Sequence, residues 1–360
     1  MKIFKLLKTL SETPGPSGFE RRIADQISQI WEPFVDKITT DRVGSVFAVK
    51  SGSGTEPRPQ LLLAAHMDEI GLMVTEVVNR DAYGFLRVTN VGGVDIRHLY
   101  SQPVVVHGRR DIHGVLASLP ARMLPSERRN GPFGFEDLVV DPGLPMEILQ
   151  ELVDIGDFIS FRQPLRKLMG KNVTGKALDN RASVAAVIIC LEELQDRNHE
   201  WDIVAAATAQ EETRLLGAYT GAFLQEPDAA VAIDVTFAKG AGLSEQGHPE
   251  LNSGPGLDIG PNVHPGMYKA LKSAAEAIEM DVSVGTHTRG SGTDAFGIQV
   301  ARSGVPTGLV SIPLRYMHTM VETVNTKDVE RTGRLLAEFI TRLDSAFLTD
   351  IVKEMMEEED

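Results

Sequence analysis

The sequence predicts an α/β fold: a mixed sheet with covering helices, interrupted by a small inserted β-barrel-like domain. In both flanks of the 360-residue chain, apolar runs typical of buried strands alternate with amphipathic helical segments. The middle, from about 72 to 163, instead carries short β-like pieces separated by turn formers such as Gly92-Gly93. Because the ends of an insertion lie close together, the two flanks can build one domain around it.

The flanks supply the expected elements of the sheet domain. Uninterrupted apolar residues predict strands at 60–68, 202–209, 229–235 and 305–312. Helical spacing of apolar residues predicts helices at 183–195, 268–279 and 328–343, the last capped by Thr326 or Asp328. We therefore expect one α/β domain from residues 1–70 and 164–360, with the β-rich insert at 71–163.

The start of the chain is basic and partly apolar, which resembles a signal peptide. Ser11, Glu12 and Thr13 interrupt the apolar residues early, and no small-residue cleavage site follows. An amphipathic first helix is therefore expected here.

Composition excludes several function classes. Lys and Arg number 36 against 50 Asp and Glu, which gives a net charge of −14. This acidic balance argues against nucleic acid and against an anionic membrane surface as partners. No apolar run approaches the roughly 20 residues of a membrane helix. The single cysteine, Cys190, excludes an internal disulfide and a cysteine-cluster zinc site, and it predicts a cytoplasmic location.

Side chains that carry chemistry recur at or just after the ends of the predicted strands, or in loops. In open α/β sheets, ligands gather outside the carboxyl ends of the strands. His66 and Asp68 end the first run, and their spacing points them to the same side of an extended segment. Asp68 could fix the second ring nitrogen of His66, as carboxylates do for metal-bound imidazoles. The alternative is a strand-end His–Asp pair without a metal.

Three further carboxylates follow the same pattern. Asp179 precedes the helix predicted at 183–195, where it is either a helix cap or a bridge between two cations. Glu211 and Glu212 follow the second strand. Adjacent carboxylates are costly when packed without cations, so one can bind metal while the other moves a proton. The alternative is a solvated loop.

The last two candidates are Asp234 and His318. Asp234 ends the third apolar run, where it is a cap, a buried hydrogen-bonding group or a metal ligand. His318 follows the fourth apolar run, where it is either a metal ligand or a structural residue. Two imidazoles and several carboxylates at similar places in the topology suit Zn²⁺, Co²⁺ or Mn²⁺. The set is typical of a hydrolase in which two cations share a bridging carboxylate and water.

Eight short motifs resemble the M42 family of metallo-aminopeptidases, which are two-metal peptidases, in the family's order and over nearly the whole chain. The motifs are GPSGFE (15–20), HMDEIG (66–71), GDFISF (156–161), ALDNR (177–181), QEE (210–212), AID (232–234), GTDAF (292–296) and RYMHTMVETV (315–324). The resemblance implies removal of N-terminal residues from peptides, by a water shared between two divalent ions, zinc or cobalt.

The resemblance also implies a role for each candidate residue. His66 and Asp234 bind one metal, His318 and Glu212 bind the other, Asp179 bridges the two, Glu211 is the general base, and Asp68 orients His66. The β-rich insert resembles the family's PDZ-like dimerisation domain. This implies self-association through the insert, up to the tetrahedral dodecamers that the family forms.

The chain departs from the family pattern at three places. Thr213-Arg214-Leu215 stands where a Val-Gly pair is usual, Ser291 replaces a glycine, and the insert has LPARML at 119–124 where Pro-Pro-His is common. None of these is a predicted ligand. Arg315, three residues before His318, is predicted to flank the substrate side-chain pocket, where a cation favours acidic side chains.

Other functions stay open at this point. Paired carboxylates also serve glycosidases, but such an enzyme leaves His66 and His318 unexplained. Another metal-dependent amidohydrolase, such as a deacylase, uses the same ligand types. A non-catalytic assembly protein that kept the fold is the third alternative, although no ligand type is replaced.

Overall fold

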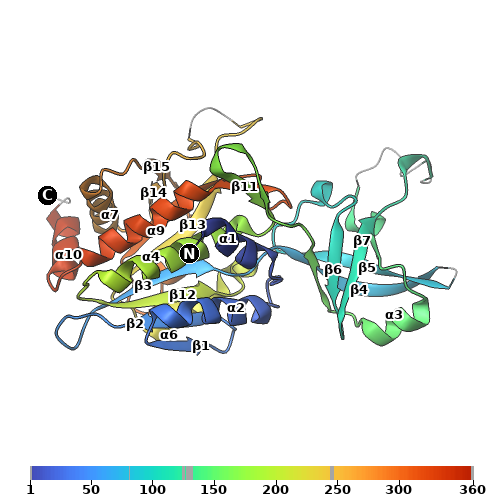
Figure 1. Ribbon diagram of the computed structural model, residues 1–360, viewed down its shortest axis with the longest axis horizontal. Helices are drawn as coiled ribbons and strands as arrows, with labels where there is room; N and C mark the ends of the chain where they lie inside the picture. The colour runs from blue at the N-terminus through green and yellow to red at the C-terminus, as the bar shows by residue number, and fades with distance from the viewer. Residues whose placement is uncertain (1, 81, 124–125, 127–132, 244–246, 358–360) are drawn as a thin grey trace.

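The computed structural model describes residues 2–80, 82–123, 126, 133–243 and 247–357, which form an α/β domain with a β-barrel beside it (Figure 1). An eleven-stranded mixed sheet runs through the described part of the α/β domain. In spatial order its main row is β1 (Lys37–Thr40), β2 (Val46–Lys50), β12 (Asp202–Thr208), β3 (Gln60–His66), β13 (Ala229–Phe237), β16 (Thr307–Arg315), β17 (Glu322–Asn325), β11 (Asn172–Gly175) and β10 (Arg166–Lys167). β14 (Gly256–Ile259) pairs with β16 and with β15 (Ser283–Thr286).

Four parallel strands, β12, β3, β13 and β16, form the centre of the sheet. They are buried on both faces because helices cover both sides, which explains their continuous apolar sequences. All four predicted strands are confirmed, with ends that shift by a few residues. Since parallel strands end at the same edge, side chains that follow β3, β12 and β13 are brought close together.

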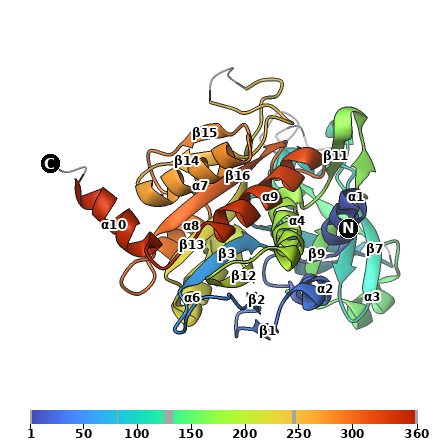
Figure 2. The ribbon, with the colours of Figure 1, turned by 60° about the vertical axis from the view of Figure 1, so that its left-hand side comes forward.

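The helices pack in two groups because successive strand residues point to opposite faces. Leu61 and Leu63 face α1 (Ile3–Glu12), α2 (Arg21–Trp31), α4 (Leu178–Glu193), α7 (Pro265–Ala277), α9 (Thr326–Thr341) and α10 (Phe347–Glu357). Leu62 and Ala64 face α6 (Leu216–Gln225) and α8 (Asp294–Gln299). α4 and α9 lie side by side across the first face (Figures 1 and 2).

Helix α9 begins differently from the sequence prediction. Its cap is Asn325, whose side-chain oxygen accepts a hydrogen bond from the backbone N–H of Lys327 at 3.0 Å, and Thr326 is the first helical residue. Asp328 lies inside the helix and accepts hydrogen bonds from the backbone of Asn252 and Gly254. The predicted caps were therefore wrong, because a distant loop takes up the carboxylate of Asp328.

The inserted segment folds into a closed barrel with its own core. The barrel order is β4 (Gly71–Arg80), β5 (Tyr83–Val91), β8 (Val139–Asp141), β7 (Asp111–Ala117), β6 (Pro103–His107) and β9 (Phe158–Phe161). Its strands pack around residues such as Leu72, Val104 and Ile159, and α3 (Met146–Leu152) covers one side. The predicted fold class, a mixed-sheet α/β domain with a β-barrel-like insert, is confirmed.

None of the helices in the described ranges combines the length and the apolar character needed to cross a bilayer.

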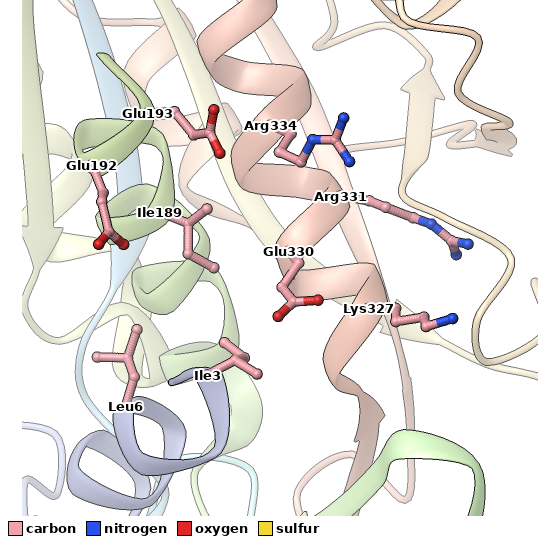
Figure 3. A pocket seen from close by; sticks show the side chains of 9 residues that line it. All are labelled: Ile3, Leu6, Ile189, Glu192, Glu193, Lys327, Glu330, Arg331 and Arg334. Atoms are coloured by element: carbon pink, nitrogen blue, oxygen red, sulfur yellow. The ribbon is translucent and has the colours of Figure 1, made fainter. Parts of the chain in front are cut away.

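A groove of about 370 Å³ lies between α1, α4 and α9 (Figure 3). Ile3, Leu6 and Ile189 provide its apolar surface, and charged side chains of α4 and α9 form the rest. Its described lining contains no imidazole or thiol, so it lacks the ligands that transition metals favour. The predicted catalytic residues gather elsewhere.

Candidate metal centre

The predicted site residues meet at the edge where the parallel strands end. His66 is the last residue of β3, and Asp234 lies in the neighbouring strand β13. Thr208, which pairs in register with His66, ends β12 just before the short helix α5 (Glu211–Arg214) that carries Glu211 and Glu212. Asp179 comes from the start of α4, and His318 from the connection between β16 and β17.

The carboxylate of Asp179 faces both imidazoles. One of its oxygens, Oδ1, lies 3.1 Å from Nε2 of His66, and the other, Oδ2, lies 3.3 Å from Nε2 of His318. The side chain is buried, so the pair of contacts is fixed by packing. One carboxylate that offers a separate oxygen to each of two ligand groups has the geometry of a bridge between two cations.

Three more carboxylates, those of Asp234, Glu211 and Glu212, lie close to the two imidazoles. Asp234 Oδ1 lies 3.9 Å and Glu211 Oε2 lies 3.8 Å from His66 Nε2. Glu212 Oε2 lies 3.4 Å from His318 Nε2. Ligand atoms of His66, Glu211 and Asp234 lie within 4.8 Å of one another, and so do those of His66, Asp179 and Glu212. The donors therefore form two overlapping groups.

Burial and crowding oppose the negative charges of these carboxylates. Burial and the neighbouring carboxylates raise the pKa of Glu211 to about 10 and that of Glu212 to about 8. Burial also raises the pKa of Asp234 well above its usual range. Burial opposes charge on His66, but the charge of Glu211 and the hydrogen bond to Asp179 outweigh it and raise the imidazole pKa.

These residues fit divalent cations. Two imidazoles and buried carboxylates are the donor set of zinc, cobalt or manganese sites. A divalent cation compensates the negative charges of the crowded carboxylates and so relieves their mutual repulsion. The same donors are a poor fit to copper(I), which prefers sulfur ligands.

Asp68 contacts both the imidazole and the glutamate helix. Its Oδ1 lies 3.5 Å from Nδ1 of His66. Its two oxygens accept hydrogen bonds of 3.1 Å from the backbone N–H groups of Glu211 and Glu212. Asp68 therefore holds the start of α5, a contact that the sequence interpretation did not foresee.

Two buried glutamates that the sequence interpretation missed also position the site. Glu322 accepts hydrogen bonds from the backbone N–H of Asp179 at 3.0 Å and of His318 at 2.9 Å, so one carboxylate fixes two candidate ligands. Glu20 accepts a hydrogen bond of 3.1 Å from the N–H of Gln210, next to Glu211. Both lie inside the motifs named above, but their partners are distant in sequence.

Buried polar contacts join three of those motifs. Lys176 Nζ lies 2.6 Å from Glu69 Oε2, while the other oxygen of Glu69 accepts a hydrogen bond from the N–H of Gly15 at 2.9 Å. Arg181 is fully buried and donates to the carbonyl oxygens of Met67 and Leu10. These contacts tie α1 and α4 to the strand end that carries His66.

A cavity of about 490 Å³ opens over the donor cluster. Its walls include Thr213, Arg214, Leu215 and Ser291. At these positions the chain departs from the family pattern, so two of the three departures face the cavity.

Arg315 is outside the described lining of the cavity, and its Nε donates to the carbonyl oxygen of Lys239. The third departure, 119–124, ends at Leu124, which lies outside the described residues.

Comparison with known proteins assigns the chain to a family. The family model described as M42 glutamyl aminopeptidase matches residues 44–335. The chain belongs to the M42 peptidase family. The lysyl aminopeptidase of Pyrococcus furiosus is 34% identical over 345 residues, which cover 94% of this chain and 97% of that protein.

Solved M42-like structures share the fold over almost their whole length. A TET aminopeptidase from a marine sediment Thaumarchaeota archaeon has a TM-score of 0.89 and 30% identity, covering 97% of this chain and 99% of that one. The TET1 peptidase of Pyrococcus horikoshii, which can assemble into a tetrahedron or a large octahedral shell, has a TM-score of 0.82 and 32% identity, covering 95% and 100%.

The M42 assignment decides the class of reaction. The protein is an aminopeptidase, a hydrolase of peptide bonds, in a metal-dependent family. The predicted family and enzyme class are therefore confirmed.

Proposed function

We propose that this M42 peptidase removes N-terminal residues from peptides at a site that holds two divalent metal ions, zinc or cobalt. The observation that carries the proposal is the position of Asp179, whose two oxygens face His66 at 3.1 Å and His318 at 3.3 Å. In this proposal His66 and Asp234 hold one ion, His318 and Glu212 hold the other, and Asp179 is shared. When bound, the pair supplies Lewis acidity and lowers the pKa of nearby water.

Glu211 is the proposed general base. It lies on the cavity wall, 3.8 Å from His66, and its neighbour Glu212 is turned toward His318. Its carboxylate takes the proton of the attacking water and returns a proton to the leaving amine. Asp68, which accepts hydrogen bonds from the N–H groups of Glu211 and Glu212, keeps the base and its neighbour in place.

The buried carboxylates also favour peptides with a free N-terminus. The cavity is lined by Asp179, Glu211, Glu212 and Asp234, so a free substrate α-amine can bind beside one of the proposed ions and a nearby carboxylate. Binding of the amine there places the first peptide bond next to Glu211, which accounts for removal of one residue at a time.

The other parts of the proposal concern location and assembly. We propose that the chain self-associates through the segment 71–163, into shells such as that of the P. horikoshii relative. The separate barrel and its exposed apolar side chains support this.

The proposed cytoplasmic location is tested by cell fractionation. The predicted role of Arg315 is tested by comparing nitroanilide substrates that carry acidic side chains with substrates that carry neutral ones.

The decisive experiment combines metal content with peptide hydrolysis. Elemental analysis of the purified protein is expected to give about two equivalents of transition metal per chain. The protein is expected to hydrolyse an unblocked peptide, to lose this activity on chelation, and to regain it with added Zn²⁺ or Co²⁺.

An N-acetylated copy of the same peptide is the control. It is expected to resist cleavage, because it lacks the charged amine. Equal cleavage of both peptides identifies a deacylase or deblocking enzyme instead. Full activity after complete removal of metal contradicts the two-metal proposal.

A further inference from the structure

The inserted barrel reaches into the catalytic cavity through the turn that follows β5. Among the described residues of the cavity wall, Gly93 is the one that comes from the segment 71–163. The turn is held by the carbonyl of Gly92, which accepts hydrogen bonds from the N–H of Val94 at 3.0 Å and the side chain of Asn90 at 2.9 Å. A fixed piece of barrel backbone therefore stands against the donor cluster.

The two glycines of this turn face two of the candidate ligands. A Cβ at Gly93 would stand 2.5 Å from Nδ1 and 2.8 Å from Cε1 of His318, far inside contact distance. A Cβ at Gly92 would stand 3.2 Å from Cβ and 3.3 Å from Oε2 of Glu212. The turn thus packs on the rear of the imidazole, whose Nε2 points toward Asp179 and Glu212.

The barrel also anchors the segment that carries His318. Met320, two residues further along the chain, is 3% exposed and belongs to the core of the barrel, with Leu72 and Val104 among its members. His318 is therefore restrained by the barrel twice: by the turn against its ring, and by the anchor of its own loop.

The two imidazoles differ in how they are held. His66 ends a central strand and its side chain is 2% exposed, whereas His318 lies in a connection and its side chain is 36% exposed. A loop side chain with this exposure keeps rotamer freedom unless packing removes it. The barrel supplies that packing at His318.

We propose that Gly93 and Met320 are positioning residues for His318, so that the inserted barrel completes the metal position to which His318 and Glu212 belong. This inference rests on the proposed two-metal function. Displacing the ring of His318 is expected to weaken the ion at that position, while the ion at His66 and Asp234 keeps its ligands. Loss of a supporting contact of this kind costs roughly 10- to 100-fold in metal affinity.

The substitution Gly93→Ala tests the steric contact. The backbone of Gly93 is not in the left-handed region, so alanine adds a clash with His318 without backbone strain. Gly240→Ala is the matched control, since its Cβ would meet nothing closer than 3.8 Å. Each protein is dialysed against dilute metal and analysed for metal per chain, and the Co²⁺-loaded forms are compared by visible absorption.

We expect two equivalents in the wild type and in Gly240→Ala. Gly93→Ala is expected to retain one equivalent, with a simpler cobalt spectrum and a roughly 10- to 100-fold higher Kd for the second ion. Circular dichroism and light scattering establish that the variant is folded and assembled.

Met320 gives an independent variant of the same contact. Met320→Ala frees the loop of His318 and is expected to weaken the same ion, whereas Met320→Leu, which nearly conserves volume, is expected to restore it. Two tightly bound ions with an unchanged cobalt spectrum in both Gly93→Ala and Met320→Ala overturn the inference alone. A wild type that binds fewer than two ions overturns the proposed function as well.

Discussion

Two adjacent glutamates, Glu211 and Glu212, face different partners although they share one turn of helix. Glu212 lies 3.4 Å from His318, while Glu211 is 3.8 Å from His66. Both backbone N–H groups donate to Asp68, which fixes the direction in which each side chain leaves the helix. One buried carboxylate therefore holds the turn from which the proposed base and the proposed ligand extend.

We predict that Glu211→Gln lowers turnover and leaves metal binding intact. The amide has nearly the same size but cannot take up a proton, so kcat is expected to fall by ~10²–10⁴ while the ligands of both ions remain. Steady-state kinetics and elemental analysis check this together. A variant with nearly unchanged kcat excludes Glu211 as the base, and a variant without metal makes it a ligand instead.

Helix α2 and the segment before it dock the sheet domain onto the barrel. The guanidinium of Arg22 makes hydrogen bonds of 2.6 and 2.8 Å to the two oxygens of Asp111, and these lower the pKa of that carboxyl to about 2. The ring of Phe19 stacks on His107 with 5.0 Å between centroids. His107 lies 2.9 Å from Asp111 and 2.9 Å from Ser160, and it is buried.

This contact predicts a pH dependence of stability. Burial lowers the pKa of His107 below its ordinary value of 6.5, although Asp111 opposes the shift. Below about pH 6.5 the unfolded chain binds a proton at His107 that the folded protein does not bind, so the free energy of unfolding falls. Once the pH is below the pKa of His107 in the folded protein, both states bind the proton. From there on His107 no longer lowers the free energy of unfolding.

Denaturant unfolding between pH 7.5 and 5.5 checks this prediction in His107→Gln. As the pH is lowered, the free energy of unfolding is expected to fall more steeply in the wild type than in His107→Gln. The two slopes are expected to differ by at most about 1.4 kcal/mol per pH unit. His113→Gln, at an exposed position of β7, is the control and is expected to follow the wild type. Identical slopes for wild type and His107→Gln contradict the assignment.

The barrel lies beside the sheet domain, away from α10 (Figure 1). Several of its apolar side chains are exposed to solvent. Val115 on β7 is 48% exposed and Ile148 on α3 is 40% exposed. These exposed apolar side chains are the candidates for the association surface proposed above.

We predict that a charge on this surface reduces the mass of the assembly. Val115→Asp and Ile148→Asp are each expected to give lighter species by light scattering, because an aspartate buried between subunits lacks a partner. Val352→Asp on α10, at the opposite end of the molecule, is the control. Wild-type mass in both barrel variants places the association surface elsewhere.

Features that depend on local pattern could be predicted from the amino-acid sequence. Runs of apolar residues predicted the four central strands, and the change to short β-like pieces predicted the barrel. The position of His66, Glu211 and Asp234 relative to strand ends predicted that they meet, because parallel strands end at one edge of a sheet. Local pattern also left α2, α6, α8 and α10 without a prediction.

The contacts between distant groups could not be predicted in this way and come from the folded structure. It set the two oxygens of Asp179 against two imidazoles, brought Glu322 to the backbone of Asp179 and His318, and placed Gly93 of the barrel behind the ring of His318. These contacts join positions far apart in the chain, so no window of the sequence contains them. They depend on how separately formed layers pack, and that packing is a property of the whole fold.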